Sequence, residues 1–245
     1  MLLSHDQRRA RLRDATLLLI FTPDLAGEAA LESLERALPF VDVIQVRPKV
    51  LGDRAPGAPK GATITGARDA AHWCRKVLAM RAASDMAMPP LVMVNDRVDV
   101  AAALAPEGLD GVHVGASDTP PAVARGVLAA DQVIGLSTHH AAELAAALDE
   151  PVDMLGFGPV FPTSTKGYLQ STAAIGQPAI VGPERAWLAA ASSTAPVFPI
   201  GGINLSNADQ LDRVGRAAVG SAILSAEDPG LAARGLRTLL SSGDE

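Results

Sequence analysis

The chain has 245 residues, of which 48% are hydrophobic, so it is long enough and apolar enough to bury one sizeable core. Its formal net charge of -6, with no long basic run, argues against nucleic acid as a partner. Its one cysteine excludes an intramolecular disulfide, no apolar run reaches the length of a membrane span, and the polar N-terminus does not resemble a secretory signal, so we expect a soluble cytoplasmic protein.

Short apolar runs alternate with helix-like segments along the whole chain. The runs occupy residues 16–22, 41–47, 91–96, 111–115, 133–138, 152–158, 196–202 and 217–223. They are almost continuously apolar, as expected of parallel strands that are buried on both faces. The intervening segments, such as "GEAALESLERAL", "HAAELAAALDE" and the final "GLAARGLRTLL", are rich in alanine and leucine with helical spacing.

Eight strand–helix units of this kind predict an α/β fold, a single (β/α)8 TIM barrel over residues 1–245, with residues 1–15 as an N-terminal extension. The alternative is a doubly wound open sheet. That fold usually carries a glycine fingerprint after its first strand, whereas the first run here continues as "FTPDLAG". Two segments, 50–63 and 167–183, are longer than a minimal barrel needs. Both follow carboxyl ends of strands, the end at which barrel active sites lie, although 50–63 is equally compatible with a disordered insertion.

Polar residues gather where the predicted strands end. Gln45, Arg47 and Lys49 alternate at the end of the second strand, so they project to one side of an extended segment. A guanidinium and an ammonium placed there are suited to a diphosphate or another anion. The alternative is a solvated strand end.

Two aspartates follow neighbouring strands. Asp96 ends the third strand and Asp118 follows the fourth, and adjacent strands lie about 4.8 Å apart. Two carboxylates at that spacing, beside cations, suit a Mg²⁺ ion that also contacts phosphate oxygens. Each aspartate also precedes a helical segment, so helix capping is the alternative.

Three further segments offer anion-binding groups. The glycine turns "IGGIN" at 200–204 and "VGSAI" at 219–223 allow backbone N–H groups to approach a phosphate, although they are also compatible with simple tight turns. The segment "GPVFPTSTKG" at 158–167 exposes three hydroxyl residues and a lysine directly after the sixth strand.

The histidines and the cysteine are expected to have structural roles. His113 lies inside the fourth strand, where a packed core histidine is expected. His139 and His140 begin a helical segment and are expected on the surface. Cys74 lies within a helical pattern and is expected in the core.

Several segments, taken in chain order, resemble the thiamine-phosphate synthase family over about residues 16–240. They are "IQVRPK", "VNDRVDVA", "LDGVHVGASD", "VIGLSTH", "DMLGFGPVFPTSTK", "FPIGGIN" and "VGSAI". The resemblance implies a (β/α)8 barrel and a transferase. The family joins 4-amino-2-methyl-5-hydroxymethylpyrimidine diphosphate to 4-methyl-5-(2-phosphoethyl)thiazole, with Mg²⁺, and forms thiamine phosphate and diphosphate. The expected partners are these two small molecules, and a homo-oligomer is left open.

The resemblance also implies roles by position. Contacts to the pyrimidine diphosphate would come from Gln45, Arg47, Lys49 and Asn95. Mg²⁺ would be held by Asp96 and Asp118. The departing diphosphate would be bound by Ser137 and Lys166, which with Arg47 form the expected catalytic set. The thiazole phosphate would be bound by Thr163 and Thr165 and by the backbones of Gly202, Ser221 and Ala222.

The chain departs from the family pattern at two positions. Pro48 stands where the family usually has glutamate, and Ala116 stands where it usually has glutamine. Proline has no backbone N–H and a fixed φ, so it affects the placement of the following Lys49. Three other functions remain in view, and the two departures support the second of them. They are a thiazole tautomerase-like barrel, a non-catalytic protein that binds thiazole phosphate or thiamine phosphate, and a phosphosugar isomerase, which would need a carboxylate or histidine base at the substrate carbon.

Overall fold

The computed structural model describes residues 2–26, 29–48, 66–163 and 179–242. Its eight strands form one parallel sheet in the order β7-β6-β5-β4-β3-β2-β1-β8. The strands are β1 (Leu17–Phe21), β2 (Val43–Val46), β3 (Leu91–Asn95), β4 (Gly111–Val114), β5 (Val133–Thr138), β6 (Met154–Phe157), β7 (Val197–Pro199) and β8 (Ala217–Val219). The α-helices are α1 (His5–Asp14), α2 (Pro23–Ala26), α3 (Ala30–Ala37), α4 (Ala67–Ala83), α5 (Val98–Leu104), α6 (Pro121–Val127), α7 (Ala141–Ala147), α8 (Pro183–Ser192), α9 (Ser221–Leu224) and α10 (Pro229–Leu240), and short 3-10 helices are η2 (Leu38–Phe40), η3 (Ala105–Glu107) and η4 (Ala208–Leu211).

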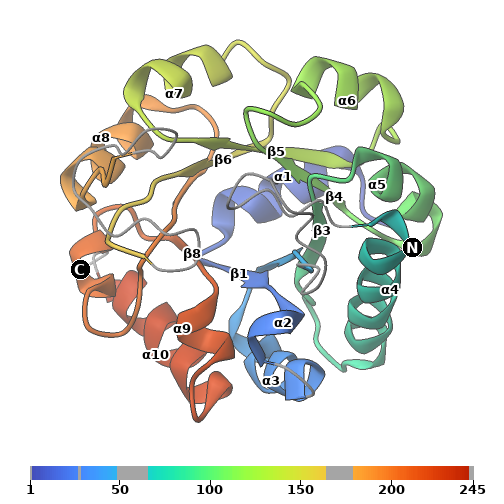
Figure 1. The fold of residues 1–245 in the computed structure, drawn as a ribbon, viewed down its shortest axis with the longest axis horizontal. Coiled ribbons are helices and arrows are strands. Elements are labelled where there is room, and N and C mark those ends of the chain that lie inside the picture. The colour runs from blue at the N-terminus through green and yellow to red at the C-terminus, as the bar shows by residue number, and fades with distance from the viewer. Residues whose placement is uncertain (1, 27–28, 49–65, 164–178, 243–245) are drawn as a thin grey trace, which may run out of the picture.

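The sheet closes on itself. An isolated parallel bridge between Ile200 and Ala218 joins the segment just after β7 to β8, the two ends of the strand order. Figure 1 looks down the resulting barrel, with strands at the centre and helices around them. The predicted (β/α)8 barrel is therefore confirmed, and the open doubly wound sheet is excluded.

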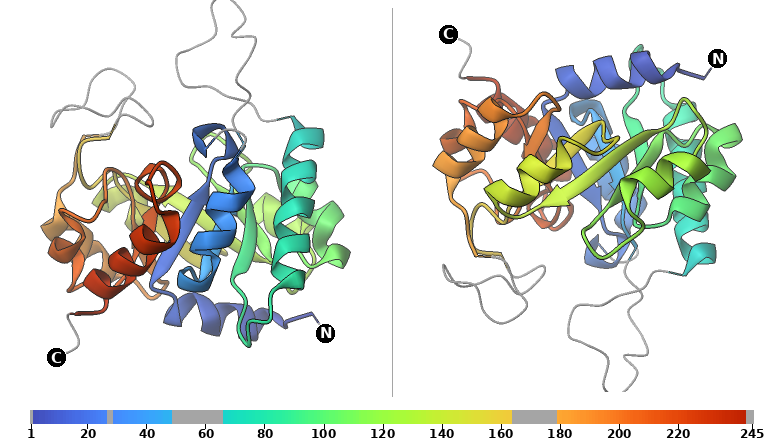
Figure 2. Two further views of the ribbon diagram at one scale, coloured as in Figure 1. Left: turned by 90° about the horizontal axis from the view of Figure 1, so that it is seen from below. Right: turned by 90° about the horizontal axis from the view of Figure 1, so that it is seen from above.

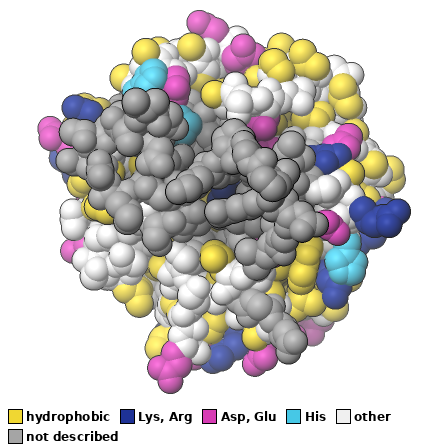
Figure 3. Space-filling model, in the orientation of Figure 1, with side chains coloured by type: hydrophobic (Ala, Val, Ile, Leu, Met, Phe, Trp, Pro, Cys, Tyr) yellow, Lys and Arg dark blue, Asp and Glu magenta, His cyan; other side chains and the backbone are white. Residues whose placement is uncertain are grey.

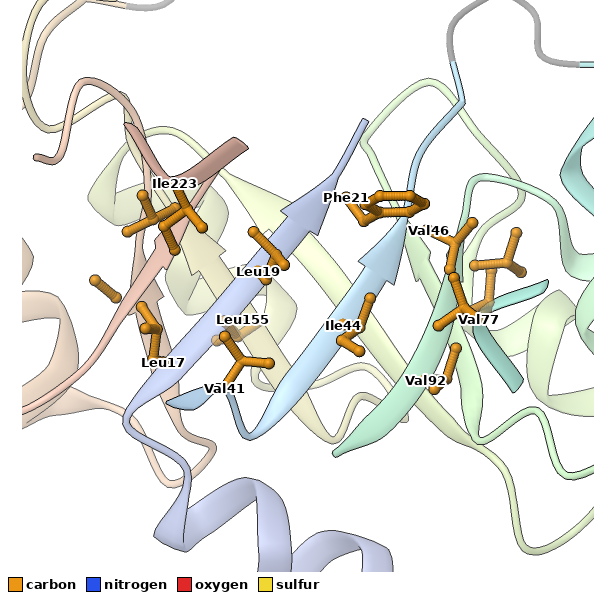
Figure 4. Close-up of a cluster of buried hydrophobic side chains, with 14 of the residues drawn as sticks. Leu17, Leu19, Phe21, Val41, Ile44, Val46, Val77, Val92, Leu155 and Ile223 are labelled. Atoms are coloured by element: carbon orange, nitrogen blue, oxygen red, sulfur yellow. The ribbon is translucent and has the colours of Figure 1, made fainter. Parts of the chain in front are cut away.

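The alternation of side chains along each strand divides the buried apolar residues into two cores. One core fills the barrel, where residues such as Leu18, Val43, Met93 and Phe198 meet. The other lies between the strands and the surrounding helices. Figure 4 shows part of it, with Leu17, Leu19 and Phe21 of β1 beside side chains of β2 and β3.

Helix α1 packs against the end of the barrel at which the strands begin (Figure 2). Ser4 caps it in a reciprocal arrangement with Gln7. Arg8 is 1% exposed, and its Nε donates to Oδ1 of Asp110 at 2.8 Å. Leu12 packs into the core inside the barrel. The segment predicted as an extension thus supplies side chains to the barrel core, Leu12 and Ala15 among them.

The segment after β7 differs from the expected strand–helix unit, because it forms the 3-10 helix η4. Polar side chains compete for its backbone N–H groups. Oδ1 of Asn207 accepts from the N–H of Asn204 at 2.9 Å, and Oδ1 of Asn204 accepts from the N–H of Ser206 at 2.8 Å. Local bonds of this kind favour turns over a regular helix.

None of the helices in the described residues combines the length and the apolar character that crossing a bilayer requires. On the face shown in Figure 3, Asp and Glu side chains are spread around the circumference of the described surface, in keeping with the net charge of -6.

Candidate functional site

A cavity of about 430 Å³ lies at the carboxyl ends of the strands. Its polar lining comes from the ends of separate strands and includes Thr22, Arg47, Ser137, His139, Thr163, Gly202, Asn204 and Ser221. The volume suits a small molecule, and the mixture of apolar walls with a few convergent polar groups is typical of a ligand site. This is the end of a (β/α)8 barrel at which active sites are built.

Two consecutive glycines form the turn after β7. Gly201 and Gly202 have φ values of +100° and +68°, which side-chain-bearing residues rarely adopt. A Cβ on Gly202 would lie 2.4 Å from the carbonyl oxygen of Pro162, and one on Gly201 would lie 2.7 Å from Cβ of Pro159. The glycines therefore let the turn pack tightly against the segment that follows β6.

The carbonyl of Gly202 is held from one side by two amides. Asn204 Nδ2 donates to it at 3.1 Å and Asn207 Nδ2 at 3.0 Å. Because the peptide bond is planar and trans, the N–H of Ile203, in the same peptide unit, points the opposite way. Sequence reasoning missed both asparagines. Their spacing, N-x-x-N one residue after a double glycine, is the signal that would have found them.

The turn after β8 adds backbone groups to the same cavity. Gly220 is the N-cap of α9, and the helix begins at Ser221 and Ala222, both of which line the cavity. The first N–H groups of a helix have no intrahelical acceptor. The predicted trio of Gly202, Ser221 and Ala222 therefore lies around one cavity.

Polar side chains also occupy the inside of the barrel just below this cavity. Nε2 of Gln45, which is 5% exposed, donates to Oδ1 of Asn95 at 2.6 Å across β2 and β3. On the next strands, Nε2 of His113 lies 2.9 Å from Oγ of Ser137. His113 is buried as predicted, but its contact with a predicted catalytic residue was not foreseen.

Arg47 lies where the strand pairing of β2 runs out. Its backbone N–H donates to the carbonyl of Phe21 at 2.8 Å, so one hydrogen bond to β1 extends beyond the last residue of β2, Val46. Arg47 is half-buried and lines the cavity. Pro48 is buried directly after it. The predicted Lys49, Thr165 and Lys166 lie outside the described residues, as do segment 50–63 and most of 167–183.

Asp96 and Asp118 lie on the loops after the adjacent strands β3 and β4. Asp96 adopts φ of +61°, an unusual value for a residue other than glycine, and its N–H donates to the carbonyl of His113 at 2.8 Å. Such backbone strain is concentrated at functional sites. Oδ2 of Asp118 accepts from the N–H of Gly115 at 2.8 Å.

Helix capping, the alternative for both aspartates, is not what the structure shows. The N-cap residues of α5 and α6 are Arg97 and Pro120. Within the described part of the chain, no group of three or more His, Cys, Asp or Glu side chains is arranged as a metal site. Mg²⁺ commonly takes only one or two carboxylates and completes its coordination with waters and substrate phosphates, so Asp96 and Asp118 are of the residue type that would hold it.

His139 and His140 precede α7 and make different contacts. His140 is its N-cap and accepts from the N–H of Glu143. The N–H of His139 donates to Oε2 of Glu143 at 2.7 Å, and His139 Nδ1 lies 3.1 Å from the same oxygen. Burial raises the pKa of Glu143, but these bonds from His139 outweigh it and hold the pKa below its usual range. His139 lines the cavity, whereas we expected a surface role.

Comparison with known proteins bears directly on this site. Residues 17–223 match the family model described as thiamine monophosphate synthase. A thiamine-phosphate synthase from Laribacter hongkongensis is 37% identical over 94% of this chain and 97% of its own length. One from Synechococcus sp. (strain CC9605) is 38% identical over 94% of this chain. The chain spans only 57% of the length of that Synechococcus protein.

Comparison with solved structures points to the same family. A thiamine phosphate pyrophosphorylase from Pyrococcus furiosus superposes with a TM-score of 0.73 at 28% identity, over 97% of this chain and all of that one. A 3-hexulose-6-phosphate synthase from Salmonella typhimurium, at 17% identity and a TM-score of 0.60, covers 93% of this chain and 99% of its own and shares the fold alone. With a family match over most of its length and a relative covered almost end to end, the chain belongs to the thiamine monophosphate synthase family.

Proposed function

We propose that this protein is a transferase that joins the pyrimidine diphosphate to the thiazole phosphate and releases thiamine phosphate and diphosphate. The observation that carries the proposal is the cavity at the carboxyl ends of the strands. There Arg47, Ser137 and Thr163 meet the glycine turns after β7 and β8, in a chain of this family. Two anionic groups, one on each substrate, would have separate sets of donors there.

The proposed reaction is a substitution at the pyrimidine methylene. The carbon–oxygen bond to diphosphate breaks first, and its electron pair leaves with the diphosphate. The resulting pyrimidine cation is then attacked by the lone pair of the thiazole nitrogen, which forms the new carbon–nitrogen bond. This order requires no nucleophilic side chain, and stabilising the charge that develops on the leaving group is the main task of the protein.

The residues divide between the two substrates. Arg47 and Ser137 would donate to the diphosphate, together with Lys49 and Lys166 from outside the described residues. Gln45 and Asn95, which bond to each other, would orient the pyrimidine ring. The thiazole phosphate would be bound by Thr163, Thr165 and the backbone N–H groups at Gly202, Ser221 and Ala222. Holding both substrates in one cavity supplies the proximity that the second step needs.

Asp96 and Asp118 would hold Mg²⁺ between the carboxyl ends of β3 and β4. Bound there, the ion supplies positive charge to the diphosphate oxygens. The two carboxylates would hold the ion, and one of them stands on the strained backbone of Asp96.

The test is to incubate the purified protein with both substrates and Mg²⁺ and to measure thiamine phosphate. Product should require metal and should be lost with EDTA. Asp96→Asn and Lys166→Ala should lower kcat/KM by at least about a hundredfold, as expected for groups that stabilise developing charge. Asp99→Asn is the matched control, because Asp99 lies three residues further on and pairs with Arg97 at the surface. It should leave kcat/KM unchanged.

A folded protein that forms no product would overturn the proposal. Binding of thiazole phosphate without turnover would then indicate the non-catalytic protein, for which the departures at Pro48 and Ala116 are the motivation. Interconversion of thiazole phosphate tautomers without condensation would indicate the tautomerase.

A further inference from the structure

We infer that His113 is a positioning residue that fixes the direction in which the hydroxyl of Ser137 donates its proton. The two side chains are in hydrogen-bond contact, with Nε2 2.9 Å from Oγ. His113 is 6% exposed, and it is Ser137 that lines the cavity. The inference rests on the proposed function, in which Ser137 contacts the departing diphosphate.

The barrel interior makes room for this imidazole by omitting side chains. In the strand register, His113 of β4 is paired with Gly135 of β5, and Ser137 is paired with Gly156 of β6. A Cβ on Gly135 would lie 2.3 Å from Nδ1 of His113, and one on Gly156 would lie 3.4 Å from its Cε1. The ring therefore extends across β5 toward β6, over two positions without side chains, and its far nitrogen reaches the serine.

Because the Ser137 hydroxyl has a single proton, its hydrogen bond with His113 decides whether that proton can be donated to the diphosphate. A serine hydroxyl has one proton to donate and two lone pairs that accept. If Nε2 of His113 took that proton, Oγ would present only lone pairs to the diphosphate, and the contact with an anion would be repulsive. If Nε2 carries a proton and donates it to Oγ, the hydroxyl proton is free to point into the cavity. The proposed role of Ser137 therefore requires the ring of His113 to donate from Nε2.

The neighbours of His113 also form a polar layer inside the barrel. On β3, the paired position is Asn95, which accepts from Gln45. Here Nε2 meets a hydroxyl in a layer whose side chains already bond to one another.

The test measures binding of inorganic diphosphate in the presence of Mg²⁺ by calorimetry, for the wild type and for His113→Leu, His113→Gln, Ser137→Ala and the double variant His113→Leu/Ser137→Ala. Loss of one hydrogen bond to the anion should weaken binding by roughly tenfold in Ser137→Ala. His113→Leu keeps the hydroxyl but leaves its direction unfixed, so it should weaken binding by more than about threefold but by less than Ser137→Ala does. The double variant should be no weaker than Ser137→Ala, because His113 acts through the serine. His113→Gln, whose amide N–H₂ replaces the Nε2 donor, should stay within about threefold of the wild type. The KM for thiazole phosphate should not change in any of them.

Additive losses in the double variant would overturn the inference, as would a His113→Gln variant that is as weak as His113→Leu. A second measurement does not depend on any variant folding. In nitrogen-15 NMR of the wild type, a His113 ring that is protonated on Nε2 supports the inference, and a ring protonated only on Nδ1 overturns it. If the wild type does not bind diphosphate at all, the proposed function fails, while the NMR result still decides the role of the ring.

Discussion

At the turn after β7, a Cβ added to either glycine would clash with the segment after β6 and displace the backbone that lines the cavity. Gly201 and Gly202 combine left-handed φ values with close contacts to the segment after β6. The other described glycines with a left-handed φ, which are Gly108, Gly182 and Gly215, would place a Cβ no closer than 3.0 Å to another atom. A Cβ on Gly126, an exposed position in α6, would meet no atom within 4 Å.

Replacing Gly202 by alanine should therefore damage binding more than folding. The new Cβ meets the carbonyl oxygen of Pro162 at 2.4 Å, so the turn must shift away from its position at the cavity. We expect the KM for thiazole phosphate to rise by at least about tenfold, since a displaced backbone loses one or more hydrogen bonds to the phosphate. Gly126→Ala is the control, with KM unchanged and stability equal or slightly higher. Equal effects of the two substitutions on KM would contradict this account of the turn.

Cys74 should be chemically silent in the folded protein. It is fully buried on α4, and burial, the largest influence, raises the pKa of its thiol to about 12. The reactive thiolate is therefore suppressed at neutral pH. A thiol reagent such as DTNB at pH 8 should label no cysteine in the native protein and one per chain in denaturant. Rapid labelling without denaturant would show that the site opens.

The positions of single residues were predictable from the sequence only in part. Asp96 and Asp118 could be placed on neighbouring loops, because parallel strands carry their carboxyl ends to one edge. The contact between His113 and Ser137 could not be predicted, because it depends on the register that sets Gly135 beside the histidine. A shift of that register by one residue would turn the ring out of the barrel.

Helix α1 makes contacts with parts of the barrel that are distant from it in the sequence. Its Arg8 reaches across the base of the barrel to Asp110, whose Oδ2 accepts from the backbone N–H of Val92 at 2.8 Å. Nη1 of Arg8 also contacts Oδ2 of Asp131 at 2.7 Å. One side chain of a helix outside the eight units thus links it to the start of β3 and to the segment before β5.

Arg8→Ala should destabilise the protein without changing its chemistry. Removing one partner leaves Asp110, which is 2% exposed, with less compensation for its buried charge, at a cost of about 3 kcal/mol. Arg9→Ala is the matched control on the same helix. Arg9 is 47% exposed, 3.4 Å from Asp153, and should cost less than about 1 kcal/mol. Urea unfolding measures both, and kcat of the folded fraction should match the wild type, because this end of the barrel lies opposite the cavity. A loss of kcat with unchanged stability would contradict the assignment.

The strands were the most predictable elements, because buried parallel strands leave nearly continuous apolar runs in the sequence. All eight runs contain a strand, but β7 covers only residues 197–199 of the run 196–202. The remainder of that run, Ile200 to Gly202, leaves the strand to form the turn at the cavity. The hydropathy of the sequence does not show where the strand ends and the turn begins. It also does not distinguish η4 from a regular helix, because the 3-10 form depends on local hydrogen bonds of Asn204 and Asn207.

At the scale of the whole molecule, ligand binding and folding should be coupled. The cavity takes its lining from β1, β5 and β8 and from the segments after β6, β7 and β8, so it exists only in the closed barrel. A ligand that binds only this form stabilises it by about 2.7 kcal/mol when its concentration is one hundred times its Kd. Thiazole phosphate should therefore raise Tm in proportion to the logarithm of its concentration. The Gly202→Ala variant should show a smaller shift, and an equal shift in both proteins would place the ligand elsewhere.

The way in which the barrel closes also determines which junction between strands is easiest to open. Neighbouring strands elsewhere share runs of paired residues, whereas β7 and β8 are joined through the single bridge between Ile200 and Ala218. Partial opening should begin at this junction, since it breaks the fewest backbone hydrogen bonds. Both residues of the bridge line the cavity, so a phosphate ester bound there would touch both sides of the junction. The substrate would then act as a temporary ninth connection in the barrel, and among the strands the unliganded protein would exchange its amide hydrogens fastest beside the place where the substrate binds.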